Sequence, residues 1–265
     1  MPSLAERHAA LLAQLRAGGS GLVAFSGGVD SSLLLALART ALGRERVLAV
    51  TVDSPFVPRA ELAAAQALAV QLDAPWEALA VDTLTVPALQ TNPADRCYHC
   101  KKMLYCRLRE IATARGLAML LDGSNADDAN EVRPGARAKA EVGAISPLQD
   151  ARLTKAEVRA LAREHGLPNA DAPAQACLAT RFPTGVRLTR EGLRRVEQAE
   201  SAVRAQGFHV VRVRDYFPCA RVEVGQDELA RARQEWPALA AKVQEFGYQQ
   251  LELDPHGYRC GSMNG

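Results

Sequence analysis

A glycine-rich loop joins a predicted strand to a predicted helix near the start of this 265-residue chain. The strand is the apolar run 21–25 (GLVAF), the helix begins near Ser31, and Ser26, Gly27 and Gly28 lie between them. Two glycines allow the backbone to curl so that several N–H groups point at one anion, and the helix dipole adds to that attraction. No Lys-Ser/Thr pair follows, so this is not a Walker A loop. We expect a different phosphate site; a glycine-rich turn without a ligand is the alternative.

Apolar strands and amphipathic helices alternate over the first 170 residues. The predicted strands are 21–25, 47–52, 76–81 and 118–122, and the predicted helices are 31–42, 59–72, 101–114 and 155–165. Such alternation is typical of βαβ units around a parallel sheet. Ligands of these sheets bind at the carboxyl ends of the strands. The polar residues that follow the predicted strands are Ser26, Asp53, Asp82 and Asp122.

The sequence pattern changes near residue 170. Beyond it, helices are predicted at 190–207 and 228–246, and strands at 210–215, 220–224 and 249–254. This order indicates a small α+β domain. We therefore predict an α/β chain with a parallel-sheet domain at 1–170 and a smaller α+β domain at 171–265.

Composition excludes several classes of function. The net charge of +2 does not favour binding to nucleic acid. No apolar run approaches the ~18 residues that are needed to cross a membrane. The N-terminal segment carries Glu6, Arg7 and Arg16 among its apolar residues, which predicts an amphipathic helix and not a signal peptide. We expect a cytoplasmic protein, whose six cysteines then favour metal binding or thiol chemistry over disulfides.

Two of these cysteines, Cys97 and Cys100, lie three residues apart at the start of a predicted helix. This spacing lets both sulfurs face one metal, but it is also found in redox pairs, zinc half-sites and iron–sulfur half-sites, and plain thiols remain an alternative. Cys177 is the natural third ligand. Three cysteine ligands on a 4Fe–4S cluster would leave one iron open for sulfide or substrate. The cysteines expected to be incidental are Cys106, Cys219 and Cys260, with a spare ligand as the alternative for Cys106.

The loop SGGVDS at 26–31 resembles the pyrophosphate-binding motif of the PP-loop ATP pyrophosphatases. This resemblance implies a domain like that of the adenine nucleotide alpha hydrolases, which splits ATP into AMP and pyrophosphate with Mg²⁺ near Asp30. The segment 122–127 (DGSNAD) resembles a nucleotide-site segment of these enzymes, although a plain β-turn is the other interpretation. The residues expected to bind ATP or its metal are Ser26, Gly27, Gly28, Asp30, Ser31, Asp53 and Gly123.

The chain as a whole resembles the LarE-type ATP-dependent sulfur transferases. The matching stretches include AFSGGVDSSLL, NPADRCYHCKKMLYCRL, LTKAEVRALAREHGLP, ACLATRFPTG and VRVRDYFPCARVEV. The resemblance implies adenylation of the carboxylates of a pyridinium biscarboxylic acid mononucleotide. It also implies their conversion to thiocarboxylates for the nickel-pincer nucleotide cofactor.

The family obtains its sulfur in two ways. Some members give up the sulfur of one cysteine, whereas others hold a 4Fe–4S cluster on three cysteines and use external sulfide. This chain has Ala176 where the sacrificial type carries its donor thiol, and Cys97, Cys100 and Cys177 match the second type. The resemblance therefore implies a cluster held by these three thiols, with sulfide or another sulfur donor as a partner.

Five further residues are assigned to the site through the resemblance. Thr180 and Arg181 follow Cys177 and are expected near the reacting carboxylate, together with Glu200, while Cys177 itself acts in the transfer. Arg212 and Arg214 alternate along a predicted strand, so both face one side, where two guanidiniums can grip a phosphate. Without the resemblance, these two arginines would be assigned to an exposed strand face. Residues in matching segments with less certain roles are Arg133, Glu141 and Lys155.

Other functions are compatible with the same loop. A tRNA thiolase should show a basic arm or an RNA-binding domain, and an amide-forming synthetase fed by glutamine would need a glutaminase. A regulator that binds adenine nucleotides would lack turnover. We expect a homo-oligomeric enzyme that takes a small-molecule nucleotide and acts on neither nucleic acid nor membranes.

Overall fold

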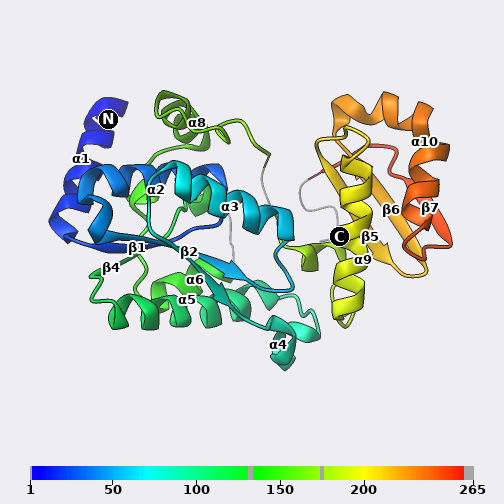
Figure 1. Cartoon of the computed structure of the whole chain (residues 1–265), viewed down its shortest axis with the longest axis horizontal. Coiled ribbons are helices and arrows are strands. Elements are labelled where there is room, and N and C mark those ends of the chain that lie inside the picture. Colours follow the sequence, from blue (N-terminus) through cyan, green and yellow to red (C-terminus); the bar gives the residue numbers. More distant parts are fainter. Residues whose placement is uncertain (1, 131–133, 174–175, 260–265) are drawn as a thin grey trace. The chain divides into compact units, whose positions relative to one another are not determined.

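The computed structural model describes residues 2–130, 134–173 and 176–259. The chain divides into two compact units (Figure 1): the first consists of Met1–Val81 and Asp95–Gln175, and the second of Asp82–Ala94 and Ala176–Gly265. Sequence analysis places one boundary near residue 170, whereas the units change over at Gln175 and the second unit also includes 82–94. None of the described helices is long and apolar enough to cross a membrane.

A four-stranded sheet forms the centre of the first unit. Its strands are β1 (Gly21–Ala24), β2 (Val47–Asp53), β3 (Trp76–Ala80) and β4 (Met119–Leu121). They lie in the order β3-β2-β1-β4, and every pair is parallel. The predicted α/β fold with a parallel sheet is confirmed, and the carboxyl ends of all four strands meet at one edge.

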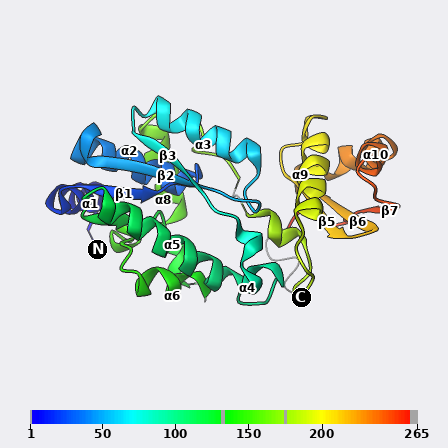
Figure 2. The same ribbon diagram turned by 60° about the horizontal axis from the view of Figure 1, so that its bottom comes forward.

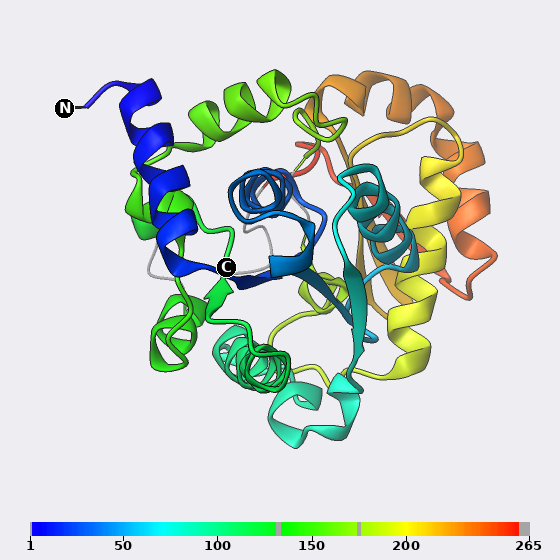
Figure 3. The same cartoon turned by 60° about the vertical axis from the view of Figure 1, so that its left-hand side comes forward.

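Helices cover both faces of this sheet (Figure 3). Because successive strand residues point to opposite faces, Val23 packs into one apolar core and its neighbour Leu22 into another. The helices of the first core are α1 (Leu4–Gly18), α2 (Val29–Leu42), α3 (Arg59–Gln71), α7 (Pro147–Asp150) and α8 (Lys155–Glu164). On the other face lies α5 (Arg96–Ala114), against which α6 (Pro134–Glu141) packs.

The start of α8 follows the capping box that the sequence contains. Thr154 accepts a hydrogen bond from the backbone of Glu157, and Glu157 accepts one in return from the backbone of Thr154. Arg7 of α1 also binds this carboxylate, and that bond, with those from Thr154, lowers the pKa of Glu157 to about 2. The cap therefore joins α8 to α1 as well as starting the helix.

The second unit is a three-stranded sheet with two long helices (Figure 2). Its strands are β5 (Val211–Tyr216), β6 (Cys219–Val224) and β7 (Gln250–Leu253), and its helices are α9 (Arg190–Arg204), α10 (Leu229–Gln244) and the short α4 (Pro87–Gln90). β5 and β6 are antiparallel, whereas β6 and β7 are parallel. Both long helices pack on the same sheet face in one apolar core, which contains Val213, Val222 and Val243. The opposite face carries polar side chains.

Segment 82–94 is tied into the second unit by backbone hydrogen bonds. The amide of Gly185 donates to the carbonyl of Asn92 and the amide of Leu188 to that of Gln90, both at 2.8 Å. The side chain of Asn92 also donates to the carbonyl of Pro183 at 2.7 Å. This segment follows β3 in sequence, but its polar partners belong to the carboxyl-terminal part of the chain.

Candidate active site

The phosphate loop lies at the carboxyl end of β1, as predicted. Gly27 has a φ of +77°, a backbone conformation that favours glycine. Gly28 is the N-cap of α2, so no cap side chain covers the first amide groups of that helix. A helix start of this kind presents backbone N–H groups to an anion.

Two serine hydroxyls converge on the loop. The Oγ atoms of Ser26 and Ser31 are 3.1 Å apart, and the Ser31 hydroxyl donates to the carbonyl of Gly28 at 3.0 Å. The Ser26 hydroxyl accepts from the amide of Gly28 at 3.3 Å. The predicted loop residues therefore bring two hydroxyl groups and a backbone amide together at the start of α2.

The carboxylate of Asp30 binds two partners from distant segments. Asn125 donates to its Oδ1 at 2.9 Å, and Lys155 forms an ion pair with its Oδ2. The backbone amide of Lys155 is fixed in turn by the carboxylate of Asp127, at 2.8 Å. Lys155 is thus more than a first-turn residue of α8, because it brings a positive charge to the phosphate loop.

The segment after β4 packs directly on the phosphate loop. A Cβ atom on Gly123 would lie 2.8 Å from the backbone nitrogen of Ser31, which is closer than real Cβ contacts allow. The amide of Ser124 donates to Asp122, forming a tight turn. Segment 122–127 therefore contains a tight turn and packs against the start of α2, while its assignment to the nucleotide site stays a prediction.

Beneath this turn is a buried polar cluster centred on Asp122. Lys139 donates to Asp122 Oδ1 at 2.5 Å, and Tyr105 donates to Oδ2. Burial raises the pKa of Asp122, but the charge of Lys139 and the hydrogen bonds outweigh it and bring the pKa to about 2. Burial, with Asp122 adding, also raises the pKa of Tyr105 well above its ordinary value. Asp122 therefore acts as a fixed acceptor at the end of β4.

The other two predicted aspartates pair with arginines. Asp53, at the end of β2, forms an ion pair with Arg59 at 2.5 Å. Asp82 belongs to the second unit, where it pairs with Arg190 at 2.7 Å.

Cys97 and Cys100 lie at the start of α5, which begins at Arg96, so the predicted helix start at these cysteines is confirmed. Cys97 is exposed and Cys100 is half-buried, so both thiols are near the surface on successive turns of one helix. Thiolates at this spacing fit half of an iron–sulfur ligand set. Cys177 is half-buried at the start of a short 3₁₀ helix in the second unit. Among the described residues, no three metal-ligating side chains form a group that could hold an ion.

Arg181 and Glu200 form a buried ion pair in the second unit. Arg181 also donates to the carbonyls of Ala176 and Cys177, at 2.7 and 3.1 Å, and to the hydroxyl of Thr180 at 3.0 Å. Burial raises the pKa of Glu200, but the positive charge of Arg181 outweighs it, so the pKa is lowered. Arg181 thus shapes the backbone that carries Cys177 and Thr180.

Arg212 and Arg214 lie on one face of β5, and both are buried. The interpretation made without the resemblance, that these two side chains form an exposed strand face, is therefore wrong. Arg214 binds Glu223 at 2.7 Å and the carbonyl of Thr180 at 3.1 Å. The guanidinium of Arg212 lies over the Tyr258 ring, and burial, with Arg181 adding, lowers the pKa of Arg212.

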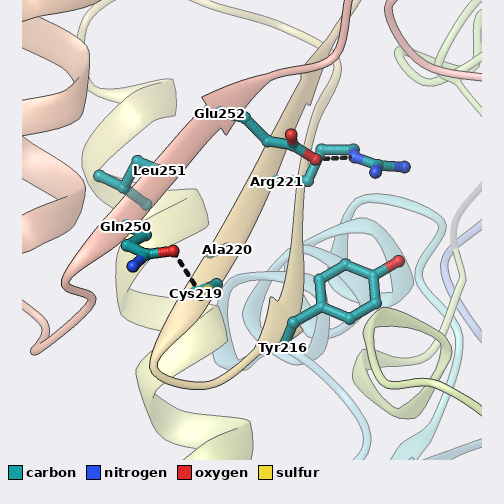
Figure 4. A pocket seen from close by; sticks show the side chains of 7 residues that line it. All are labelled: Tyr216, Cys219, Ala220, Arg221, Gln250, Leu251 and Glu252. Atoms are coloured by element: carbon teal, nitrogen blue, oxygen red, sulfur yellow. Dashed lines mark hydrogen bonds and ion pairs between the residues drawn. The ribbon is translucent and has the colours of Figure 1, made fainter.

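A separate hollow of about 440 Å³ lies on the sheet of the second unit, where β5 ends and β6 and β7 begin (Figure 4). Within it Cys219 is hydrogen-bonded to Gln250 and Arg221 is paired with Glu252, while the ring of Tyr216 lies beside them. None of the predicted site residues lines this hollow.

Sequence reasoning missed several residues that support the site. Lys139 is a buried lysine in a short helix that was not predicted, and Asn169 follows α8 where no helix or strand was predicted. Asn125 belongs to segment 122–127, which the resemblance assigns to the nucleotide site, but no individual role was predicted for it. These residues support the site through contacts between segments that are distant in the chain, and a single sequence does not reveal such contacts. Two residues named from sequence, Arg133 and Cys260, lie outside the described residues.

Comparison with known proteins connects this geometry to a family. Residues 13–174 match the family model described as NAD synthase. Pyridinium-3,5-bisthiocarboxylic acid mononucleotide synthase of Lactiplantibacillus plantarum is 38% identical over 264 residues, which is 100% of this chain and 96% of that protein. Synechocystis sp. protein slr1717, described as uncharacterized, is 39% identical over 245 residues, 92% of this chain and 91% of that one. NMN synthetase from Francisella tularensis superposes with a TM-score of 0.54 at 18% identity, over 66% of this chain and 76% of that chain.

The parallel sheet and its loop at the end of β1 define a PP-loop ATP pyrophosphatase domain. The likeness to NMN synthetase, at 18% identity, concerns the fold alone. Because the 38% identity extends over the full chain, the protein belongs to the family of pyridinium-3,5-bisthiocarboxylic acid mononucleotide synthase. The resemblance inferred from the sequence is thereby confirmed.

Proposed function

We propose that this protein is an ATP-dependent sulfur transferase that forms AMP and pyrophosphate. Its substrate is pyridinium-3,5-biscarboxylic acid mononucleotide, whose carboxylates become thiocarboxylates on the route to the nickel-pincer nucleotide cofactor. The full-length likeness to a synthase named for the bisthiocarboxylic product carries this choice of reaction. We assign the protein to the cytoplasm, where thiols stay reduced.

The first step activates the carboxylate. A carboxylate is a poor electrophile because its leaving group would be oxide, so a carboxylate oxygen attacks the α-phosphorus of ATP and pyrophosphate leaves. Gly28 and the first amides of α2 hold the departing phosphates, and the hydroxyls of Ser26 and Ser31 add hydrogen bonds. The product of this step is an acyl adenylate.

Charge on the phosphates is balanced near Asp30. Its carboxylate is the hard oxygen ligand that Mg²⁺ prefers, and Asn125 and Lys155 already orient it. Asp30 would hold the Mg²⁺ of the nucleotide, and Lys155 supplies a second positive charge beside the loop. Asp53 and Gly123 border the same edge of the sheet, where Gly123 lets the turn approach α2 closely.

The second step transfers sulfur. A sulfide attacks the acyl carbon, the bond from that carbon to the AMP oxygen breaks, and thiocarboxylate, AMP and a proton result. Cys97, Cys100 and Cys177 are the thiols that would hold a 4Fe–4S cluster, which when bound supplies an iron without a cysteine ligand for sulfide. Arg181 fixes the backbone around Cys177 and Thr180 through three hydrogen bonds, with Glu200 neutralising its charge.

The substrate phosphate is assigned to Arg212 and Arg214. Both guanidiniums lie on one face of β5 in buried surroundings, where a phosphate gains more from charged hydrogen bonds than it would in water. Glu223 pairs with Arg214 and holds its guanidinium in place.

The decisive experiment follows the sulfur atom. Anaerobically reconstituted protein is incubated with ATP, Mg²⁺, sulfide and the biscarboxylated nucleotide. The masses of the products are then measured by mass spectrometry. We expect oxygen-to-sulfur exchange with one AMP formed per exchange. Release of AMP and pyrophosphate without exchange would contradict sulfur transfer while leaving ATP splitting intact. An Asp30→Ala or Gly28→Pro variant that still forms AMP at the full rate would contradict the ATP site.

A further inference from the structure

The side chain of Asn169 binds the phosphate loop from behind. Its Nδ2 atom lies 2.7 Å from the carbonyl oxygen of Gly27 and 2.9 Å from the Oγ of Ser32. A carbonyl oxygen only accepts hydrogen bonds, so the nitrogen of the amide must face Gly27. The Ser32 hydroxyl donates to the carbonyl of Gly28 at 2.9 Å, which leaves its oxygen to accept from Asn169.

The contact with Gly27 sets the direction of the peptide group between Gly27 and Gly28. In a trans peptide the C=O and the following N–H point in opposite directions. Because Asn169 binds the carbonyl of Gly27, the N–H of Gly28 points away from Asn169, and it is directed at the Ser26 hydroxyl inside the loop. The next carbonyl, that of Gly28, is held separately by the amide of Ser32 at 2.9 Å and by the Ser31 hydroxyl at 3.0 Å.

The position of Asn169 is itself rigid. Leu167 and Ala170 on either side of it are buried in the core of the first unit. The amide of Leu167 donates to the carbonyl of Ala162 at 2.9 Å, and that of Ala170 donates to the carbonyl of Leu167 at 3.2 Å. The loop is therefore held by a side chain whose backbone is fixed at the end of α8.

The oxygen of the Asn169 amide has no hydrogen-bond donor among the described residues. This Oδ1 atom is buried. A buried acceptor without a donor lowers stability. The cost of burying this oxygen without a donor offsets the stability that the two Nδ2 hydrogen bonds contribute. An asparagine at this position therefore adds little to the free energy of unfolding.

We propose that Asn169 is a positioning residue for the ATP reaction, because it aims the amide of Gly28 at the phosphates. The inference rests on the proposed phosphate role of the loop. Removing the side-chain amide lets the peptide group between Gly27 and Gly28 rotate, so phosphate affinity falls although no atom that contacts the phosphate is changed. The fold keeps its stability because the orphan oxygen leaves with the amide.

The test measures binding of Mg²⁺-pyrophosphate, and separately of Mg²⁺-ATP, to the full-length chain by titration calorimetry. We expect Asn169→Ala to weaken both about ten-fold, the size of one or two hydrogen bonds, with little change in Tm. Asn169→Asp, which keeps the shape but cannot donate to Gly27, should weaken both at least as much. The control is Gln14→Ala, which removes an exposed amide of the same unit that is bonded to Asp150.

The outcomes separate the two proposals. Wild-type affinity in Asn169→Ala and Asn169→Asp overturns the positioning role and leaves the phosphate loop standing. A lower Tm in these variants with unchanged affinity overturns it as well, because the side chain would then serve only stability. A wild-type chain that binds neither ATP nor pyrophosphate overturns the loop assignment and the inference together. Sulfur transfer is judged separately by mass spectrometry.

Discussion

The guanidinium of Arg181 and the carboxylate of Glu200 meet in a buried ion pair, with Nε 2.7 Å from Oε1 and both side chains almost wholly inaccessible. Arg204 adds a second guanidinium to the same carboxylate at 2.8 Å, and the backbone amide of Val213 donates to it at 3.1 Å. Glu200 is thus the acceptor on which one end of α9, the start of β5 and the loop after Cys177 depend.

Removing one partner of this pair should destabilise the fold. Glu200→Leu leaves the Arg181 charge buried without its carboxylate, so the free energy of unfolding should fall by about 3–5 kcal/mol. Urea unfolding measures the change, and Lys242→Ala, which breaks the exposed pair with Glu245, should leave it nearly unchanged. Adding Arg181→Met to Glu200→Leu should recover part of the loss. Full stability with lost activity in Glu200→Leu would contradict the structural role.

The free energy of unfolding should depend on pH at low pH because of the cluster around Asp122. Its pKa is about 2 in the fold against an ordinary value of 3.8, so it contributes stability above about pH 4 that is lost as the pH falls toward 2. The difference corresponds to about 2 kcal/mol. In Lys139→Met, burial dominates and raises the pKa of Asp122 above its ordinary value, so this carboxyl destabilises the fold at neutral pH and its contribution improves as the pH falls. Unfolding free energies between pH 2 and 7 test this, and identical pH profiles for the two proteins would contradict it.

A methyl group at Gly123 should disturb the ATP site. In Gly123→Ala the new Cβ would overlap the backbone of Ser31, so the turn after β4 must move away from the start of α2. We expect KM for ATP to rise at least ten-fold, a change of about 1.4 kcal/mol, in a pyrophosphate-release assay. The matched control is Gly43→Ala, which has a φ of +84° but open space around the added methyl. It should lower stability and leave KM unchanged; equal effects on KM would contradict the argument.

Iron content should depend on three particular thiols. After anaerobic reconstitution we expect about four irons per chain, lost in Cys97→Ala, Cys100→Ala or Cys177→Ala. Cys106→Ala is the matched control because Cys106 lies on the same α5 helix, two turns beyond Cys100. Iron counting with visible absorbance measures the result. A wild-type chain without iron, or equal loss in Cys106→Ala, would rule out this ligand set.

Much of the fold was predictable from local pattern. Apolar runs bounded by turns predicted all seven described strands to within two residues. The runs of the first sheet are apolar because strands of a parallel sheet are buried on both faces, whereas valine and arginine alternate along β5 because one face of its sheet packs on the apolar core. Thr154 and Glu157 predicted the start of α8 because a capping box is a local hydrogen-bond pattern. The pair Cys97 and Cys100 was likewise predicted to lie at the start of a helix, and α5 begins one residue before Cys97.

The candidate site was predictable only where its chemistry is local. The phosphate loop is one continuous segment, so spacing and glycine content were sufficient to find it. Partners of Asp30 and Asp122 come from segments up to 125 residues away, and nothing in the spacing indicates that Lys155 or Lys139 reaches them. The burial of Arg212 and Arg214 was hidden for the same reason: alternation shows which residues share a face, and only the fold shows what covers it.

The interleaved order of the two units limits how this protein can be dissected. Because 82–94 interrupts the first unit and belongs to the second, the polypeptide passes between them three times. A fragment that ends at residue 175 would retain Gln90 and Asn92 without the amides of Leu188 and Gly185, and a fragment from 176 onward would lack their carbonyls. Neither half is therefore a self-sufficient piece for expression, and fusing 82–94 onto the carboxyl-terminal fragment is the rational way to restore it.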